Sequence, residues 1–190
     1  MARFAFRPTP LDGVTVVERA PIGDERGFLE RIWCAEEWAP VFGSRSVAQI
    51  NHTRTGSVGT VRGLHYQVPP FAETKYISCL NGAILDVAVD IRRGSPTFLQ
   101  WHAEELTADN FRSLVVPEGF AHGFQALTDD CTVLYVNTAP HDASSERGIN
   151  PLDPALAIEW QLPPANLSER DGERPLLAPD FVGLDVGELA

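Results

Sequence analysis

Lysine is almost absent from this sequence of 190 residues. Lys75 is the only one, and the other 14 of the 15 basic residues are arginines. An ammonium group differs from a guanidinium group in shape and hydration, so the two are not interchangeable in a binding site. Two interpretations follow: a general bias of composition toward arginine, or a specific need for an ammonium group at position 75.

Long apolar runs are also missing. No run approaches the roughly 20 residues that a membrane-spanning helix needs, and no apolar segment of the signal-peptide kind follows the two arginines in residues 1–10. The three cysteines, Cys34, Cys79 and Cys131, form no CxxC pair, which argues against a zinc site or a disulfide framework. We therefore expect a protein of the reducing cytoplasm without membrane association.

Positive charge is outweighed overall. The formal net charge is -11 at pH 7, and a surface this acidic argues against binding to nucleic acids or anionic membranes. It still allows one anionic ligand in a locally basic pocket. Apolar residues make up 44% and charged residues 22%, a globular composition, and the length predicts one domain covering residues 1–190.

Short β-type runs recur along the chain at spacings of about 8–12 residues, which favours an all-β sandwich or barrel. Asn81-Gly82 predicts a β-hairpin between two of them. Helices are expected only at residues 36–42 and 107–111. The proline-rich tail from Pro163 is expected to wrap the surface or fold over an opening. The predicted strands are residues 14–17, 28–32, 46–50, 59–64, 75–80, 83–90, 98–103, 113–116, 123–127 and 132–137.

The segment VRGLHYQ at residues 61–67 is the first candidate for chemistry. Arg62 and His65 are three positions apart, so a regular strand would point them to opposite faces. Gly63 between them predicts a bulge or bend that brings both into one pocket. The alternative is a core histidine that is hydrogen-bonded to the backbone.

A metal-dependent cupin oxygenase or isomerase is the competing hypothesis. Such sites use two histidines two positions apart, but Gln67 stands where the second would follow His65. A three-ligand site from His65, His122 and a carboxylate such as Glu118 stays open. The fingerprints GxGxxG, GxxxxGK[ST] and GxSxG do not occur at the positions that a dinucleotide, P-loop or hydrolase site requires. Cys79 lies in an apolar run, where packing is its expected role.

Several further stretches occur together and in one order along the chain. They are GDERGFLE (23–30), QINH (49–52), VRGLHYQVPP (61–70), the lone Lys75, LDVAVDIRRGSPTF (85–98), VPEGFAHGF (116–124), Leu134-Tyr135 and LSERD (167–171). Jointly they resemble the dTDP-4-dehydrorhamnose 3,5-epimerases, which are metal-free cupins. The resemblance implies an all-β cupin, a double-stranded β-helix jelly roll with a few short helices. It also implies a homodimer, a nucleotide-sugar substrate and no cofactor.

The family inverts C3 and C5 of a 4-keto-6-deoxyhexose carried on dTDP. Both carbons lie beside the C4 ketone, so each C–H is acidic if the resulting enolate is stabilised. The reaction therefore needs a base on one face, a stabiliser for the enolate oxygen and a proton donor on the other face. The resemblance implies that His65 is the base, that Asp171 holds its ring, that Tyr135 is the acid and that Lys75 faces the enolate oxygen.

Further residues resemble the substrate-binding positions of the family. Arg62 corresponds to a diphosphate ligand, since a guanidinium can bind phosphate oxygens in pairs. The resemblance implies that Gln49 and Asn51 contact the sugar and phosphates, and that His122 reaches the substrate. Asp86 and Glu118 are expected to be structural supports. The residues that resemble a segment reaching the nucleotide from a partner subunit are Arg26, Phe28 and Glu30.

One position departs from the family pattern. Family members commonly carry a second tyrosine six residues beyond the acid, and this chain has His141 there. A histidine can still hydrogen-bond to a substrate, but it is shorter and titrates near neutral pH. An epimerase acting at only C3 or only C5 of a related nucleotide sugar is therefore the close alternative. A sugar-binding cupin without catalysis is disfavoured, because binding alone needs neither an acid nor a base.

Overall fold

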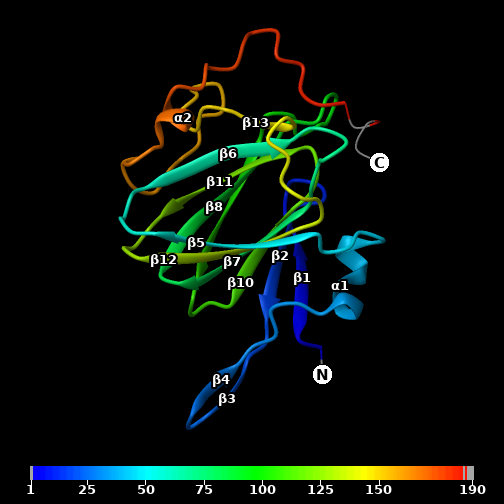
Figure 1. The fold of residues 1–190 in the computed structure, drawn as a ribbon, viewed down its shortest axis with the longest axis vertical. Helices are drawn as coiled ribbons and strands as arrows, with labels where there is room; N and C mark the ends of the chain where they lie inside the picture. The colour runs from blue at the N-terminus through cyan, green and yellow to red at the C-terminus, as the bar shows by residue number, and fades with distance from the viewer. Residues whose placement is uncertain (1, 186, 188–190) are drawn as a thin grey trace.

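The chain folds mainly into two antiparallel sheets (Figure 1). The computed structural model describes residues 2–185 and 187. Residues from both sheets, such as Ile77 and Val133 on one and Ile84 and Phe124 on the other, share one buried core cluster. The sheets therefore face each other, as in a cupin jelly roll, and the all-β prediction is confirmed. The six-stranded sheet has the order β1 (Phe4–Pro8), β2 (Thr15–Arg19), β10 (Arg112–Val116), β7 (Lys75–Asn81), β12 (Cys131–Asn137) and β5 (Gln49–Thr55).

The second sheet is covered on its outer face by the C-terminal part of the chain. Leu85, Val87 and Val89 pack there against Trp160 and Phe181. This cover explains why nearly every residue of the interior strand β8 is buried, and it confirms that the tail wraps the surface. The five strands, in spatial order, are β13 (Glu146–Gly148), β6 (Val61–Gln67), β11 (Phe120–Ala126), β8 (Ala83–Asp90) and β9 (Trp101–Thr107).

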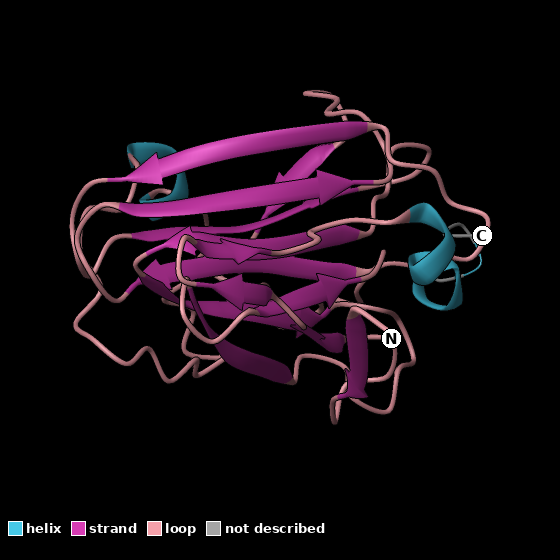
Figure 2. Cartoon of the chain, turned by 90° about the horizontal axis from the view of Figure 1, so that it is seen from below, coloured by secondary structure: helices cyan, strands magenta, loops and turns pink. Residues whose placement is uncertain are grey.

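The remaining elements lie outside the two sheets. Helix α1 (Ala35–Phe42) buries Trp38 and Phe42 against the outer face of the six-stranded sheet. Strands β3 (Ile22–Asp24) and β4 (Gly27–Leu29) form a separate two-stranded arm that projects away from the sheets (Figure 1). Helix α2 (Glu169–Gly172) contacts β6, and strands make up most of the regular structure (Figure 2). No helix in the described ranges is long and apolar enough to span a bilayer.

The predicted hairpin at Asn81-Gly82 is wrong. The turn exists, and Gly82 uses a positive φ of 77°, but β7 pairs with β10 and β12 whereas β8 pairs with β11 and β9. The chain therefore crosses from one sheet to the other at this turn. The edges of β7 are taken by the later strands β10 and β12, and those of β8 by β9 and β11, which a local turn signal does not reveal.

The predicted helix at residues 107–111 is also wrong. Thr107 ends β9, and the Asn110 side chain accepts from the backbone amides of Thr107 and Arg112. Phe111 has a φ of 53°. These side-chain bonds satisfy the backbone locally and compete with a helix. The predicted strands at residues 46–50 and 98–103 begin and end earlier than β5 and β9 do in the structure. The sequence did not predict β1, β3, β13 or α2.

The bend expected at Gly63 is confirmed and sets the direction of two neighbouring side chains. Gly63 has a φ of 116°, and the pairing of β6 with β11 shifts register between His122 and Phe124. A Cβ atom on Gly63 would lie 2.6 Å from the Cα of Gly123 and 2.7 Å from the carbonyl oxygen of His122. Only glycine allows this approach, and as a result both Arg62 and His65 line one cavity.

We predict that Gly63→Ala lowers the free energy of unfolding by about 3 kcal/mol, because the methyl group would force both the backbone and β11 to move. Urea denaturation at pH 7 measures the change. Gly56→Ala is the matched control, since no atom lies within 4 Å of its added Cβ and its φ is not positive. A loss at Gly63 no larger than that at Gly56 would contradict the prediction.

Candidate active site

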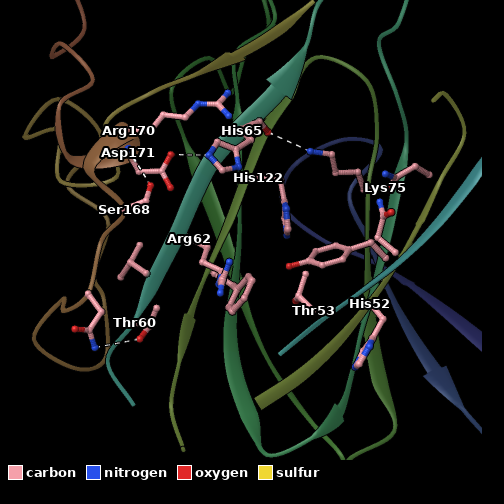
Figure 3. A pocket seen from close by; sticks show the side chains of 16 residues that line it. His52, Thr53, Thr60, Arg62, His65, Lys75, His122, Ser168, Arg170 and Asp171 are labelled. Carbon is pink, nitrogen blue, oxygen red and sulfur yellow. Dashed lines mark hydrogen bonds and ion pairs between the residues drawn. The ribbon is translucent and has the colours of Figure 1, made fainter. Parts of the chain in front are cut away.

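A cavity of about 640 Å³ opens between the two sheets (Figure 3). This volume is typical of small-molecule sites. Strands β5, β7 and β12 contribute residues from one sheet, β6 and β11 from the other, and the segment around α2 closes one side. The lining residues are Asn51, His52, Thr53, Thr60, Val61, Arg62, His65, Lys75, His122, Phe124, Tyr135, Asn137, Asn166, Ser168, Arg170 and Asp171.

His65 of β6 is bound to Asp171 of α2. The Nε2 atom of His65 lies 2.7 Å from Oδ1 of Asp171. Ser168 caps α2 and accepts from the Asp171 amide at 3.1 Å, and the Gly63 amide donates to Asp171 Oδ2 at 3.4 Å. An ionised carboxylate only accepts hydrogen bonds, so we assign the proton to Nε2, which leaves the lone pair of the neutral ring on Nδ1.

The pKa of Asp171 reports the strength of this arrangement. Burial alone would raise it, but the hydrogen bond and charge of His65, with the bonds from Ser168 and Gly63, bring the pKa down to about 2. The carboxylate is therefore ionised throughout the neutral range. An ionised partner favours the imidazolium that forms when a histidine accepts a proton.

Tyr135 lies on the facing sheet. It belongs to β12 and lines the same cavity as His65. Burial raises the pKa of its phenol well above the usual value, so the hydroxyl keeps its proton at neutral pH. The structure therefore brings a histidine and a protonated phenol together from opposite walls.

His122 forms a second histidine–carboxylate pair. Its Nε2 lies 2.8 Å from Oδ1 of Asp86, which is fully buried. Burial raises the pKa of Asp86, against the opposing effect of the His122 charge. The His122 ring meets the Tyr135 ring edge-on, with centroids 6.1 Å apart. His122 thus lines the cavity and supports Tyr135.

Lys75 lies where this cavity meets a smaller one of about 210 Å³. Its Nζ is 3.1 Å from Oε1 of the buried Glu73 and donates to the carbonyl oxygen of His65 at 3.4 Å (Figure 3). The side chain retains only 15% of its exposure. These contacts hold the ammonium group beside both cavities.

Arg62 is an exposed cation that lines the main cavity. Its Nε donates to Thr55 Oγ1 at 3.0 Å, and its NH2 group approaches the carbonyl oxygen of Arg54 at 3.5 Å. Within residues 2–185 and 187 no carboxylate pairs with it. Its charge is therefore available to a ligand.

The smaller cavity receives three other predicted binding residues. Gln49 donates to Asn51 Oδ1 at 2.9 Å and accepts from the His141 backbone amide at 2.9 Å. The His141 ring lies 3.0 Å from Glu146 Oε2. Asn51 lines both cavities, whereas Gln49 and His141 line only the smaller one. His141 thus stands beside, not inside, the larger cavity.

The structure does not bring the other three predicted binding residues into a cavity shared with His65. Arg26 pairs with Asp24 at 2.5 Å on the β3–β4 arm. Phe28 on that arm is 60% exposed, with its ring against Phe111 at a centroid distance of 5.2 Å. Glu30 pairs at 2.7 Å with Arg19, whose side chain is buried.

The metal-ligand set considered from sequence is not assembled. Glu118 forms a two-point ion pair with Arg45 at 2.6 Å, consistent with a structural support. His65 and His122 face different carboxylates. In the part of the chain that is described, no group of three His, Cys, Asp or Glu side chains converges as a metal site requires.

Several cavity residues were not predicted. Thr53 and Asn137 follow Asn51 and Tyr135 by two positions on their strands, so alternation along a strand would have found them. Ser168 and Arg170 precede Asp171 at the N-cap and in the first turn of α2, a helix that the sequence did not predict. Other unpredicted lining residues include His52, Thr60 and Asn166 of the larger cavity and Glu146 of the smaller one.

The profile of a known family matches residues 8–179, and its description is dTDP-4-dehydrorhamnose 3,5-epimerase. The chain belongs to the dTDP-4-dehydrorhamnose 3,5-epimerase family. A family member from Sinorhizobium fredii, named for that activity, is 38% identical over 173 residues, covering 90% of this chain and 89% of its own. A dTDP-4-dehydrorhamnose 3-epimerase from Streptomyces niveus is 36% identical over 174 residues, covering 91% of this chain and 84% of its own.

A solved structure of the family has the same fold. The dTDP-6-deoxy-D-glucose-3,5-epimerase of Legionella pneumophila, in complex with dTDP-4-keto-L-rhamnose, superposes with a TM-score of 0.87 at 38% identity. The match covers 91% of this chain and 92% of that one. The resemblance found from sequence motifs is thereby confirmed, as is the isomerase class of the family.

We predict that Asp171→Asn removes a contribution to stability that depends on pH. The folded pKa, about 2, lies below the unfolded value near 3.8, so the contribution is present above pH 4 and is lost as pH falls toward 2. The advantage of the unsubstituted chain in free energy of unfolding should shrink by about 2 kcal/mol over this range. Denaturant titrations at pH 5 and pH 2 measure it, and an unchanged difference contradicts it.

Proposed function

We propose that this chain epimerises a dTDP-4-keto-6-deoxyhexose at C3 and C5, by proton transfer at the carbons beside the C4 ketone. One observation carries the proposal: His65 on one sheet and the protonated Tyr135 on the facing sheet line a single cavity. A sugar ring between them presents one face to a base and the other to an acid. Removal of a proton from one face and its return to the other inverts the carbon.

The roles follow from the groups' chemistry. His65 takes the proton through Nδ1 while Asp171 holds Nε2–H and favours the resulting imidazolium. Lys75 stabilises the enolate oxygen as a point charge. This role explains why the only lysine of the sequence stands at position 75. Tyr135 returns a proton to the opposite face. His122 orients the phenol side of the cavity and contacts the substrate.

Arg62 is the binding residue proposed for the nucleotide end of the substrate. Arg62 has no carboxylate partner among the described residues and is suited to bind the diphosphate. Gln49 and Asn51 supply polar contacts to the sugar and phosphates. As part of the same proposal, the chain is a single epimerase domain that forms a cytoplasmic homodimer, in which Arg26, Phe28 and Glu30 reach the partner's nucleotide. The exposed apolar side chains of the β3–β4 arm support this assembly.

Inversion at C3 alone is the second candidate, and two observations favour it. His141 is tied to Glu146 in the smaller cavity and takes the place of the family's second tyrosine. A relative with 36% identity is named as a 3-epimerase. The relatives of this chain include proteins named as 3,5-epimerases and one named as a 3-epimerase.

Incubation with dTDP-4-keto-6-deoxyglucose in deuterated water is expected to place deuterium at both C3 and C5, because each inversion exchanges a carbon-bound proton with solvent. Proton NMR and mass spectrometry of the product read the positions. Deuterium at C3 alone supports the second candidate. A folded protein that incorporates none at either carbon contradicts both for this substrate.

We predict that His65→Ala and Tyr135→Phe each lower kcat by about 10²–10⁴-fold, since each removes a general acid or base. KM and calorimetric affinity for a dTDP-sugar product should change by less than about threefold. His102→Ala is the control, because His102 lies on β9 and lines neither cavity. Equal losses in affinity and turnover would show that these groups bind and do not catalyse.

A further inference from the structure

Arg174 lies two residues beyond α2 and has a largely buried guanidinium group. Its side chain is 15% exposed, and its Nε and NH2 atoms have no hydrogen-bond partner within residues 2–185 and 187. Nε lies 3.6 Å from Oδ1 of Asp171. The same oxygen atom lies 2.7 Å from Nε2 of His65. The guanidinium and the imidazole therefore approach one carboxylate oxygen.

Gly148 of β13 leaves the space that this guanidinium fills. A Cβ atom on Gly148 would lie 2.7 Å from NH2 of Arg174 and still closer to its Cζ and Nε atoms. Gly148 is directly opposite His65 in the pairing of β13 with β6. Residues in directly opposite positions share a face of the sheet, with their Cβ positions about 4.5–5.5 Å apart. Arg174 thus takes the side-chain position next to His65 on the face that carries His65.

The charge of Arg174 is the feature that needs an explanation. An apolar side chain of similar length would fill the space beside Gly148 without losing hydration, whereas burial of a charge with incomplete hydrogen bonding is costly. Asp171 is the only ionic partner of Arg174 among the described residues. The Asp171 carboxylate already accepts from His65 and from the Gly63 amide. A guanidinium in this position therefore acts on the Asp171–His65 pair through its charge.

We infer that Arg174 is a positioning residue that opposes protonation of His65, acting through the Asp171 oxygen that both side chains approach. An ionised carboxylate favours an imidazolium, and a nearby cation disfavours it. A general base has to be unprotonated when its substrate arrives. Arg174 offsets the effect of Asp171 before the sugar binds, so that the ring is free to accept a proton. The inference rests on the proposed epimerase function and extends it beyond the groups that touch substrate.

Other charged and titratable groups face His65 from the elements packed around it. Strands β11 and β13 and helix α2 contact β6, and β7 and β12 line the cavity across from it. These groups are Lys75, His122, Tyr135, Glu146, Arg170 and Asp171, with Arg62 on the same strand as His65. Arg174 lines neither cavity. Its substitution changes the charge next to Asp171 and leaves the lining of both cavities intact.

Arg174→Met removes the charge and keeps a side chain of similar length. We expect the acidic limb of the pH profile of kcat/KM, which reports the free enzyme, to move to higher pH by about one unit. The sign follows because an imidazole without the opposing cation accepts a proton more readily. Arg174→Lys keeps the charge and should leave the limb within about 0.3 unit of its original position. Steady-state kinetics with dTDP-4-keto-6-deoxyglucose between pH 5 and pH 9 measures both.

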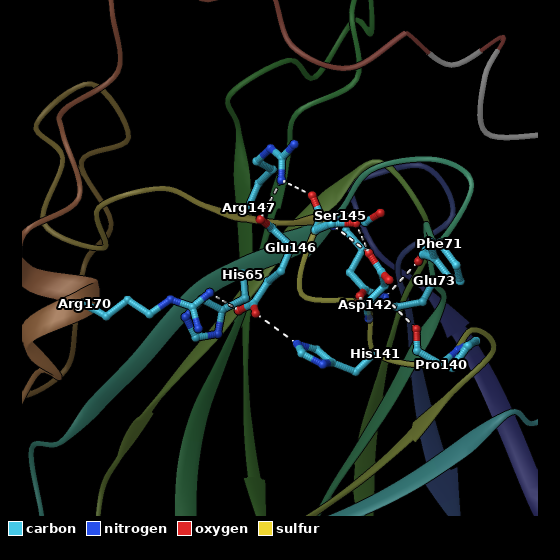
Figure 4. A network of polar contacts seen from close by, with 12 residues as sticks. His65, Phe71, Glu73, Pro140, His141, Asp142, Ser145, Glu146, Arg147 and Arg170 are labelled. Atoms are coloured by element: carbon cyan, nitrogen blue, oxygen red, sulfur yellow. Dashed lines mark hydrogen bonds and ion pairs between the residues drawn. The ribbon is translucent and has the colours of Figure 1, made fainter.

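Arg147→Met is the matched control for the change in net charge. Arg147 directly precedes Gly148 and is opposite Tyr66, so it lies on the other face of β13. Its NH1 donates to the backbone carbonyl oxygens of Ser144 at 2.8 Å and Glu146 at 2.9 Å (Figure 4). It lines neither cavity, and we expect its limb to stay within about 0.3 unit. An equal shift in Arg147→Met and Arg174→Met, or none in Arg174→Met, overturns the inference.

An NMR titration of the histidine rings tests the same inference without turnover. The His65 signal is assigned by its loss in His65→Ala, and the pH at which the ring is half-protonated is compared between the chains. In Arg174→Met, or in Arg174→Gln if the methionine variant does not fold, this pH should be about one unit higher. An unchanged value overturns the inference. If the unsubstituted chain exchanges no deuterium, the proposed function fails, and the titration still decides the role of Arg174.

Discussion

The facing of the two sheets is the constraint on which the site depends. One apolar core cluster, with residues such as Ile77, Leu106 and Phe124, fixes the sheets against each other, while polar side chains line the cavity where they part. A rigid spacing suits the proposed proton transfer, because a base and an acid acting on one sugar ring must reach its opposite sides. His65 on β6 and Tyr135 on β12 belong to different sheets, so the distance between them is set by how the sheets pack.

The second constraint is that buried charges are paired before any substrate arrives. Arg19 pairs with Glu30, Arg92 with Asp90, and Lys75 with Glu73. Burial of an unpaired charge costs several kcal/mol, so such pairs preserve charge in a folded interior. Lys75 illustrates the benefit, since Glu73 keeps an ammonium group beside His65 without exposing it fully to water. The Lys75–Glu73 pair thus prepares the charge of the site before a ligand binds.

Much of the fold and the central site could be predicted from sequence because both leave local or motif-level signals. Strands β7, β8 and β12 have β-type composition over their full length, and helix α1 was placed within one residue. Gly63 marked the bend that turns Arg62 and His65 into one cavity. The motif resemblance predicted that Asp171 holds the ring of His65, although the two residues are 106 positions apart. The structure shows the hydrogen bond between them.

The rest depended on contacts that no local pattern records. Asn81-Gly82 has the composition of a hairpin turn, but β7 pairs with β10 and β12, and β8 pairs with β9 and β11 in the other sheet. Strand β13 has only three residues and no alternation of apolar and polar side chains. The sequence therefore did not predict that Glu146 lines a cavity with His65. The residues 107–111 fold as a turn because Asn110 bonds the backbone at both sides.

The charge of the cavity runs opposite to the charge of the chain. The whole sequence carries -11, yet the larger cavity is lined by Arg62, Lys75 and Arg170 against the single acid Asp171. Asp171 is committed to His65 and Glu146 binds Arg170 from outside this cavity, so Arg62 remains the cation with no carboxylate to neutralise it in the described chain. A cleft lined by one sign of charge concentrates the opposite ion even on a protein of unfavourable net charge. A cleft of this kind therefore suits a compact anionic substrate such as the nucleoside diphosphate sugar of the proposed function, even on a chain with a net charge of -11.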